Sequence, residues 1–240
     1  MIYTNIHDVP LFAYDLIYAD PAWPFENYST KGESRNPNRH YATMSIEQLK
    51  ALPVGHIAAE TAVLAMWVTD PLLPHCIDVM AAWGFRYATV LFTWAKRTRL
   101  DTGWHMGTGY YSRANPEMCL LGLNGRRAPA VRDVRQLIVE PVREHSRKPD
   151  RCITDLERMF PGGRKIELFA RTERPGWDAW GNETKKFEAG NERLNEDTDP
   201  APIGPDAAQR RGGSGADWGD DDLERRHSAR HADMPAGRLL

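Results

Sequence analysis

Short, almost unbroken apolar runs alternate with segments of helical periodicity through the middle of the chain. Residues 61–69 form one such run, as expected for a strand that is covered on both faces of its sheet. Residues 72–83 follow with helical spacing up to Gly84, and residues 87–94 are again rich in β-favouring side chains. This succession predicts an α/β protein with a mostly parallel sheet and crossover helices.

The same kind of pattern extends the predicted fold toward both ends of the chain. Ser45 and Gln48 form a capping box, which predicts a short helix up to about Leu52. A second helix is expected to begin near Asp150 and to end at the glycine pair 162–163. Further strands are predicted at residues 16–19, 117–123, 137–139 and 165–170.

Composition changes near residue 190. The chain has 240 residues, of which 41% are hydrophobic, enough for one substantial core. Beyond residue 190, Pro, Gly, Asp, Arg and Ala dominate without apolar periodicity. We therefore expect one folded domain over residues 1–189 and a disordered, charged tail over residues 190–240.

The net charge of −2 conceals an asymmetry along the chain. Between Trp94 and Arg151 there are 12 Lys and Arg against 6 Asp and Glu, whereas from Gly190 onward there are 7 against 11. A basic middle and an acidic tail thus partly cancel each other. This balance argues against a protein that binds nucleic acid over its whole surface, but it allows a local contact in the middle.

The three cysteines, Cys76, Cys119 and Cys152, are widely spaced in apolar surroundings. They form no Cys-x-x-Cys or Cys/His cluster, so neither a disulfide framework nor a metal site is expected. The N-terminus lacks a signal-peptide pattern, and no apolar segment is long enough to cross a bilayer. We therefore expect a cytoplasmic protein with no membrane partner.

Asp20 to Phe25, with the sequence Asp-Pro-Ala-Trp-Pro-Phe, directly follows the apolar run 16–19. Its prolines end regular structure, so a carboxylate and the indole of Trp23 are expected at the carboxyl end of a buried strand. Ligands of open α/β sheets bind at that edge. An acidic acceptor and a flat ring suit an adenine or cytosine drawn out of a helix. A common turn beside a core Trp is the alternative interpretation.

A second candidate surface runs from Lys96 to Arg113, where cations alternate with aromatic rings and glycines. Cations can contact phosphates and rings can stack on bases, so this segment predicts a nucleic-acid contact. A solvated loop is the alternative. The residues expected to contact the substrate here are Lys96, Arg97, Arg99, Tyr110, Tyr111 and Arg113.

Three separated blocks carry a family resemblance: Asp20-Pro21-Ala22-Trp23, Ser146-Arg147-Lys148-Pro149-Asp150, and residues 164–171 followed by Gly181-Asn182-Glu183. In this order and spacing the chain resembles the adenine-N(6) methyltransferase family of the mRNA-adenosine-methylase (MTA-seventy) type, in particular its bacterial and phage members. The resemblance extends from about Leu16 to Glu183. It implies a Rossmann-like fold with permuted motif order, helices on both faces of the sheet, and S-adenosylmethionine as the cofactor.

The resemblance also implies roles for individual residues. Asp20 and the Pro21 carbonyl would accept hydrogen bonds from the adenine amino group, with Trp23 in the base pocket. Lys148 would pair with the cofactor's carboxylate. The remaining cofactor-binding positions would be Asp20, Glu167, Phe169, Arg171, Asn182 and Glu183, and the positions lining the acceptor side would be Tyr41 and Glu117.

The activity expected from this resemblance is methyl transfer to the exocyclic amino group of adenine in DNA. Adenine methylation in RNA and a catalytically silent, nucleic-acid-binding partner subunit are the alternatives, and methylation of a protein glutamine or a small amine is a third. Family members often pair two such domains, so a homodimer or a paired methylase subunit is compatible with the sequence.

Overall fold

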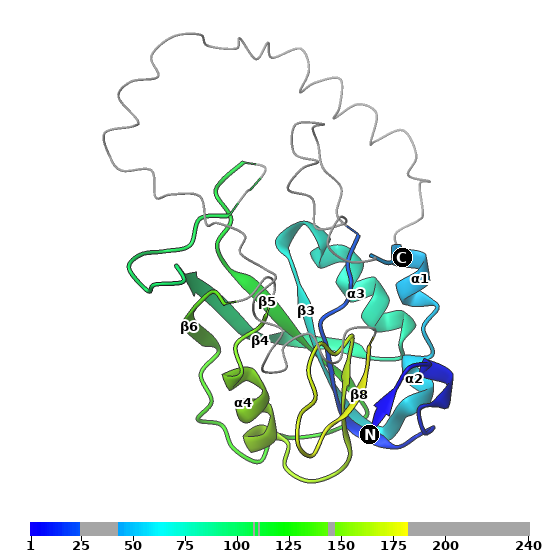
Figure 1. The fold of residues 1–240 in the computed structure, drawn as a ribbon. Helices are drawn as coiled ribbons and strands as arrows, with labels where there is room; N and C mark the ends of the chain where they lie inside the picture. Colours follow the sequence, from blue (N-terminus) through cyan, green and yellow to red (C-terminus); the bar gives the residue numbers. More distant parts are fainter. Residues whose placement is uncertain (25–42, 108, 110, 144–146, 182–240) are drawn as a thin grey trace, which may run out of the picture. The chain divides into compact units, whose positions relative to one another are not determined.

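A computed structural model describes residues 1–24, 43–107, 109, 111–143 and 147–181. These residues form an eight-stranded sheet with the order β1-β8-β7-β2-β3-β5-β4-β6 (Figure 1). Neighbouring strands are parallel, except that β5 is antiparallel to both β3 and β4. The strands are β1 (Ile2–Tyr3), β2 (Tyr14–Ala19), β3 (Ala58–Val68), β4 (Arg86–Arg97), β5 (Glu117–Asn124), β6 (Leu137–Pro141), β7 (Lys165–Leu168) and β8 (Asp178–Trp180).

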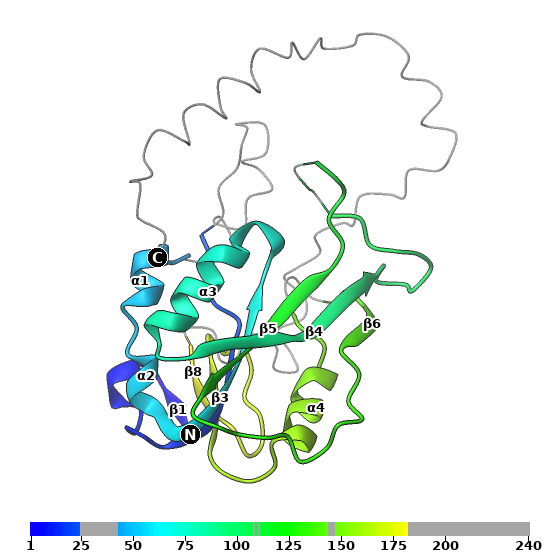
Figure 2. The same cartoon turned by 180° about the vertical axis from the view of Figure 1, so that it is seen from behind.

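Helices cover both faces of this sheet, as Figures 1 and 2 show from opposite sides. On one face lie α1 (Ile46–Lys50), α2 (Val54–Ile57) and α3 (Leu73–Ala82), and on the other lies α4 (Arg151–Met159). Two short 3-10 turns, η1 (Ile6–Asp8) and η4 (Asp70–Leu72), precede β2 and α3. The predicted α/β fold is therefore confirmed.

The central strand β2 shows why its apolar run is continuous. Ile17 packs into the core shared with α1, α2 and α3, whereas its neighbours Leu16 and Tyr18 pack into the core beside α4. All three are at most 3% exposed. Successive side chains of a strand point to opposite faces, so a strand covered on both faces needs apolar residues throughout. Each such fully buried aliphatic side chain contributes about 2 kcal/mol.

Element boundaries differ from the prediction in several places. The predicted helix 72–83 begins as an α-helix only at Leu73, because Asp70 to Leu72 form the 3-10 turn η4. Strand β4 continues three residues beyond the predicted end at Trp94, and the last long strand stops at Leu168. The two- and three-residue strands β1 and β8 were not predicted, because segments so short carry no periodicity.

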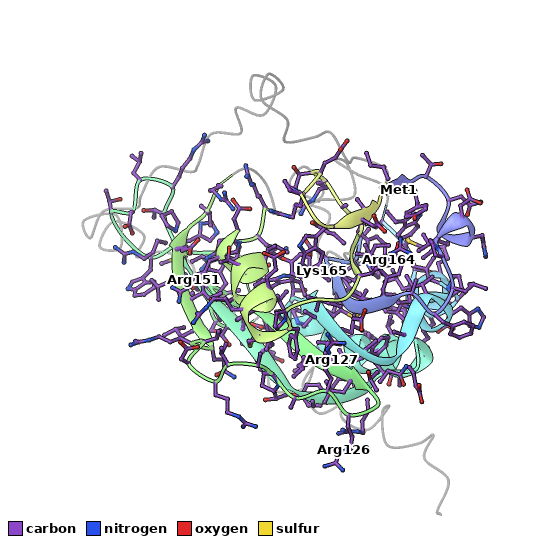
Figure 3. The ribbon with its side chains drawn as sticks, turned by 90° about the horizontal axis from the view of Figure 1, so that it is seen from below. Met1, Arg126, Arg127, Arg151, Arg164 and Lys165 are labelled. Atoms are coloured by element: carbon purple, nitrogen blue, oxygen red, sulfur yellow. The ribbon has the colours of Figure 1, made fainter. Side chains whose placement is uncertain are left out.

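The amino end of β2 is joined to the turn after α4. That helix ends at Met159, three residues before the predicted glycine pair, and Gly162 and Gly163 then turn the chain with φ of 73° and 70°. A Cβ atom on Gly163 would overlap the Asp15 carboxylate, so only glycine fits there. Asp15 accepts hydrogen bonds from the Arg164 backbone N–H (3.0 Å) and from Arg127 Nη1 (2.8 Å). Figure 3 views the molecule from this end, with Arg127 and Arg164 labelled.

Two further predictions concern the ends of the chain and the membrane. The charged tail from residue 190 lies outside the described residues. Within the described ranges, no helix combines the length and apolar character needed to span a membrane.

Candidate active site

The turn after β2 holds Asp20 at the carboxyl end of that strand. The Trp23 backbone N–H donates to the Pro21 carbonyl (2.8 Å), which closes the turn. The Trp23 indole N–H donates to the Trp67 carbonyl near the end of β3 (2.9 Å), and Met44 N–H donates to the Ala22 carbonyl. The turn is therefore tied to the neighbouring strand, which fixes the position of Asp20.

Two cations from distant parts of the chain converge on Asp20. Lys148 Nζ and Arg171 Nη2 each lie 2.9 Å from the same carboxylate oxygen, Oδ2. Lys148 precedes α4 and Arg171 follows β7, and the side chains of Asp20 and Arg171 are each 17% exposed. The other oxygen, Asp20 Oδ1, accepts no hydrogen bond from any described residue.

The contacts of Lys148 extend into a longer series of ion pairs. Lys148 Nζ also lies 3.2 Å from Glu117 Oε2, and Lys96 Nζ lies 2.6 Å from Glu117 Oε1. Five side chains of alternating sign are thereby linked, in the order Lys96, Glu117, Lys148, Asp20 and Arg171. We call this series the ion-pair chain. It runs from the end of β4 to the segment after β7.

The aromatic surroundings of Lys148 shield it from water. Its side chain is 8% exposed, and Nζ lies 5.5 Å from the centroid of the Trp67 ring. The Trp67 indole in turn donates to the Tyr18 hydroxyl at 2.7 Å. Tyr18 and Trp67 thus form a wall behind the lysine, where a cation over a ring is attracted to its π-face.

A second network lies beside the ion-pair chain and joins β7 to the start of α4. Arg174 Nε lies 2.9 Å from Glu167 Oε2, and Arg174 Nη1 lies 3.3 Å from Asp150 Oδ1. Arg143 pairs with the other Asp150 oxygen at 2.6 Å and also donates to the Lys148 carbonyl. These contacts fix the backbone that carries Lys148.

The two networks enclose one pocket at the carboxyl ends of β2 and β7. Phe169 stands at its edge with φ of 60°, which is rare for a residue with a side chain, and its ring meets Trp180 edge-on at 5.1 Å. A Cβ atom on Gly181 would overlap the Ala170 backbone, so glycine is required there. The pocket is lined by Tyr18, Asp20, Arg147, Lys148, Glu167, Phe169, Arg171, Thr172 and Arg174.

The surroundings move the pKa values of several groups in this site, among them Glu117, Lys148 and Glu167. Burial would raise the pKa of Glu117, but Lys148 and Lys96 outweigh it and lower the value to about 2. Burial would lower the pKa of Lys148, yet Asp20 and Glu117 hold it above its ordinary value. Burial raises the pKa of Glu167, although Arg174 opposes this. The ammonium form of Lys148 is therefore favoured in this site.

The predicted site residues divide into five groups. Those predicted to bind the cofactor that lie in the described ranges all line the pocket: Asp20, Lys148, Glu167, Phe169 and Arg171. Glu117 and Lys96 join them through the ion-pair chain. Pro21 and Trp23 form the turn beside the pocket. Arg97 ends β4, and Arg99, Tyr111 and Arg113 lie on the loop between β4 and β5. Tyr41, Tyr110, Asn182 and Glu183 lie outside the described residues.

Three residues important to the site were not predicted. Arg174 bridges Glu167 and Asp150, and its place three residues after Arg171 is the only signal that the sequence offers. Tyr18 and Trp67 fell in predicted strands and were given no role in the site. Their role depends on strand pairing, because β2 and β3 run side by side.

The fold and the pocket together define the class of this protein. Seven of the described strands run in one direction and one is reversed, and a charged pocket with aromatic residues at its edge lies at the carboxyl ends of the strands. This is the arrangement of a Rossmann-like methyltransferase. Comparison with known proteins identifies the family. The profile of the MT-A70 family matches residues 14–183. The chain belongs to the MT-A70 family. This membership confirms the predicted adenine-N(6) methyltransferase class and the S-adenosylmethionine cofactor.

Several curated relatives are similar over most of this chain. The type II methyltransferase M.MunI from Mycoplasma sp is 33% identical, over 73% of this chain and 79% of the relative. The mouse N(6)-adenine-specific methyltransferase METTL4 is 31% identical, over 73% of this chain and 38% of its own length. The human N(6)-adenosine-methyltransferase catalytic subunit METTL3 is 27% identical, over 70% and 28%. The chain thus spans most of M.MunI but well under half of the other two.

Proposed function

We propose that this protein transfers the methyl group of S-adenosylmethionine to the exocyclic amino group of adenine in DNA, with Asp20 as the group that contacts the acceptor amine. The observation that carries this proposal is the asymmetric binding of the Asp20 carboxylate. Two cations hold Oδ2, while Oδ1 accepts no hydrogen bond from a described residue. An acceptor that is rigidly held on one side and open on the other suits an incoming N–H group.

The chemical need for such an acceptor follows from the nucleophile. The amino nitrogen of adenine is a weak nucleophile because its lone pair is conjugated with the ring. Hydrogen bonds to Asp20 Oδ1 and to the Pro21 carbonyl favour the pyramidal nitrogen and stabilise the positive charge that develops on it. Lys148 and Arg171 keep Oδ2 in place, so the carboxylate does not have to reorganise as this charge appears.

The residues around the pocket fit the cofactor chemically. When bound, S-adenosylmethionine supplies an activated methyl group on a sulfonium. Lys148 is a buried ammonium suited to the cofactor's carboxylate, Glu167 is an acceptor suited to hydroxyl or amino groups, and Arg171 is a donor beside them. Glu167 and Arg171 are in addition positioned by partners within the protein. The chain's own task is to orient both reactants and to exclude water.

The proposal that DNA is the substrate is supported by how much of each relative's length the chain matches. The chain covers 79% of M.MunI, a type II methyltransferase, whereas METTL3 has much further sequence outside the match. RNA is the alternative substrate, because METTL3 acts on adenosine as its name states. We also propose a cytoplasmic location, which agrees with the buried, unbridged state of Cys76, Cys119 and Cys152.

A transfer assay with methyl-labelled S-adenosylmethionine tests the proposal. Unmethylated DNA and RNA, each single- and double-stranded, are the acceptors, and the products are digested to nucleosides to locate the label. We expect label on adenine-N(6) of DNA. Label on RNA alone would select the alternative substrate. Label on neither, with calorimetry showing that the cofactor binds, would contradict methylation of nucleic acid and leave the silent partner subunit.

A further inference from the structure

The indole of Trp104 is displayed at the surface just beyond the end of β4. It is 60% exposed, although a tryptophan has much apolar area to bury. Trp104 pairs with Arg97 through an isolated antiparallel bridge, and Arg97 Cζ lies 4.8 Å from the centroid of the indole ring. One face of the ring is therefore backed by a guanidinium group, and a large part of the ring remains open to solvent.

The guanidinium behind the ring is itself fixed. Arg97 Nε donates to Asp101 Oδ1 at 2.7 Å, and Nη2 donates to the Asp101 carbonyl at 3.1 Å. The intervening turn is closed by Thr98, whose N–H donates to the Gly103 carbonyl and whose hydroxyl accepts from the N–H groups of Thr102 and Gly103. The ring is thus presented by an ordered turn, so little conformational entropy is lost when a ligand stacks on it.

The base of this turn is clamped to the active site. The Asn115 side chain accepts from Lys96 N–H at 2.9 Å and donates to the Lys96 carbonyl at 2.9 Å, as a neighbouring strand would. It also donates to the carbonyl of His105, the residue after Trp104. Lys96 is the first member of the ion-pair chain that ends on Asp20 and Arg171. The exposed ring is therefore connected to the pocket through adjacent, fixed residues.

The charge around the ring indicates the chemistry of its ligand. Arg99 and Arg113 are exposed and form no ion pair with a described residue, so both are available for phosphate groups. Tyr111 on the same loop is 99% exposed. Figure 1 shows this β4–β5 connection extending beyond the end of the sheet. Open rings between unpaired cations are the arrangement found where proteins bind single-stranded nucleic acid.

We propose that Trp104, backed by Arg97, is a stacking platform for a nucleobase that flanks the target adenine in single-stranded nucleic acid. The inference rests on the proposed function, because it assigns the flanking contact of that same site. The platform takes the π-face of any base, and Arg99 and Arg113 contact the adjoining phosphates. The platform then sets how the nucleic-acid strand lies across the pocket. Other residues make the contacts to base edges that read the sequence.

Fluorescence anisotropy with a labelled single-stranded DNA of mixed sequence tests the platform, with Trp104→Ala, Trp104→Phe and Phe12→Ala compared. Phe12 is a matched control, because it is 71% exposed and lies at the amino end of β2. Trp104→Ala is expected to weaken binding by about tenfold, as loss of one base stack does, without changing the slope of log K against log salt. Trp104→Phe should restore most of the binding, and Phe12→Ala should change neither quantity.

A further variant separates stacking from charge, and controls separate the two proposals. Arg99→Ala with Arg113→Ala should weaken binding and also reduce the salt slope, by roughly one to two. Calorimetry with S-adenosylmethionine should give the wild-type affinity for Trp104→Ala, which shows that the protein is folded. Wild-type protein that neither binds nor methylates nucleic acid would contradict the proposed function. If the wild-type protein binds and methylates nucleic acid and Trp104→Ala binds it with the same affinity, the platform alone would be overturned.

One other outcome would also overturn the platform. If Trp104 instead contacts a second copy of the chain, Trp104→Ala would shift sedimentation toward a smaller species and weaken nucleic-acid binding only at concentrations where that shift occurs. Sedimentation velocity on all variants at the concentrations of the binding assay detects this. We expect the same species for wild type and Trp104→Ala.

Discussion

The two ends of β2 each carry an aspartate, and the two side chains are bound in different ways. At the amino end, both oxygens of Asp15 are used: Oδ1 accepts from Arg127 and Oδ2 from the Arg164 backbone. At the carboxyl end, both cations hold Oδ2 of Asp20 and Oδ1 is left without a described partner. Both oxygens of Asp15 thus have a protein donor, whereas only one oxygen of Asp20 does.

This difference separates a structural carboxylate from a functional one. Asp15 joins β2 to the loop after β5 and to the turn before β7, and each of its oxygens already accepts a hydrogen bond from the protein. Asp20 pairs with two cationic side chains, whereas Asp15 pairs with one, and Asp20 lines a pocket while one of its oxygens has no described donor. Buried polar groups are normally satisfied within the protein, so an unused acceptor beside a pocket indicates that a ligand completes the set.

Substitution of the two aspartates should give opposite results, and this is the largest effect that we expect. Asp20→Asn keeps the shape but removes the charge that stabilises the developing ammonium, so kcat should fall on the order of 10²- to 10³-fold. Asp15→Asn should leave kcat within about twofold and lower the melting temperature instead. Single-turnover methyl transfer at saturating cofactor, alongside thermal unfolding, measures both.

Cofactor affinity provides the control for this pair. Asp20→Asn should bind S-adenosylmethionine at near wild-type affinity by calorimetry, because Lys148 keeps Glu117 as its partner and remains in the pocket. A wild-type transfer rate in Asp20→Asn would contradict the role of Oδ1. A loss of transfer in Asp15→Asn at temperatures where that variant is folded would contradict the distinction between the two ends.

The ion-pair chain predicts an acid-sensitive contribution to stability at the carboxyl end. The pKa of Glu117 is lowered from 4.5 to about 2 in the folded protein. The contribution of ionised Glu117 to the stability of the fold is therefore fully present above pH 4.5 and is lost as the pH falls toward 2. Glu117→Gln should therefore lower the free energy of unfolding at neutral pH by on the order of 3 kcal/mol. Its stability should also vary less than that of wild type across this pH window.

Urea unfolding at a series of pH values measures this difference. Glu47→Gln is the control, because Glu47 pairs with Lys50 on the surface of α1 and is 83% exposed. Exposed pairs contribute little, so its pH profile should match that of wild type. Parallel profiles for Glu117→Gln and wild type between pH 4.5 and 2 would show that the two lysines do not stabilise the ionised Glu117.

The distinction between Asp15 and Asp20 also shows what the sequence reveals and what it does not. Asp20 was predictable because prolines follow an apolar run, which places a carboxylate at a strand end. The convergence of Lys148 and Arg171 on it was predictable only from the order of the family's blocks. Both cations bind the same carboxylate oxygen of Asp20, and this choice depends on how the side chains of neighbouring strands are oriented in the folded protein. No pattern along the chain encodes it.

Hydrogen bonds and ion pairs between residues far apart in the chain could not be predicted from the sequence, for the same reason. Asn115 was given no role from the sequence, yet its side chain makes the hydrogen bonds of a strand partner to the backbone of Lys96, which lies 19 positions earlier. Lys96 and Arg97 were predicted as free cations for phosphate, and instead their charges are committed to Glu117 and Asp101. An alternation of cations and rings identifies a basic loop. It does not reveal which cations the fold has already paired.

The smallest effect that we expect concerns Arg127, the cation that pairs with Asp15. Its guanidinium is 20% exposed and the Asp15 side chain is 28% exposed, so the pair is partly screened by water. Arg127→Met keeps most of the side-chain volume and removes the charge-assisted hydrogen bond to Asp15 together with a longer one to the Thr61 carbonyl. It should therefore lower the free energy of unfolding by about 1 kcal/mol. Asp15 would still accept from the Arg164 backbone.

Methyl transfer should be unchanged, and urea unfolding with and without high salt measures the loss of stability. If Arg127→Met impaired transfer but not stability, the amino end of β2 would not be the purely structural counterpart of the Asp20 end.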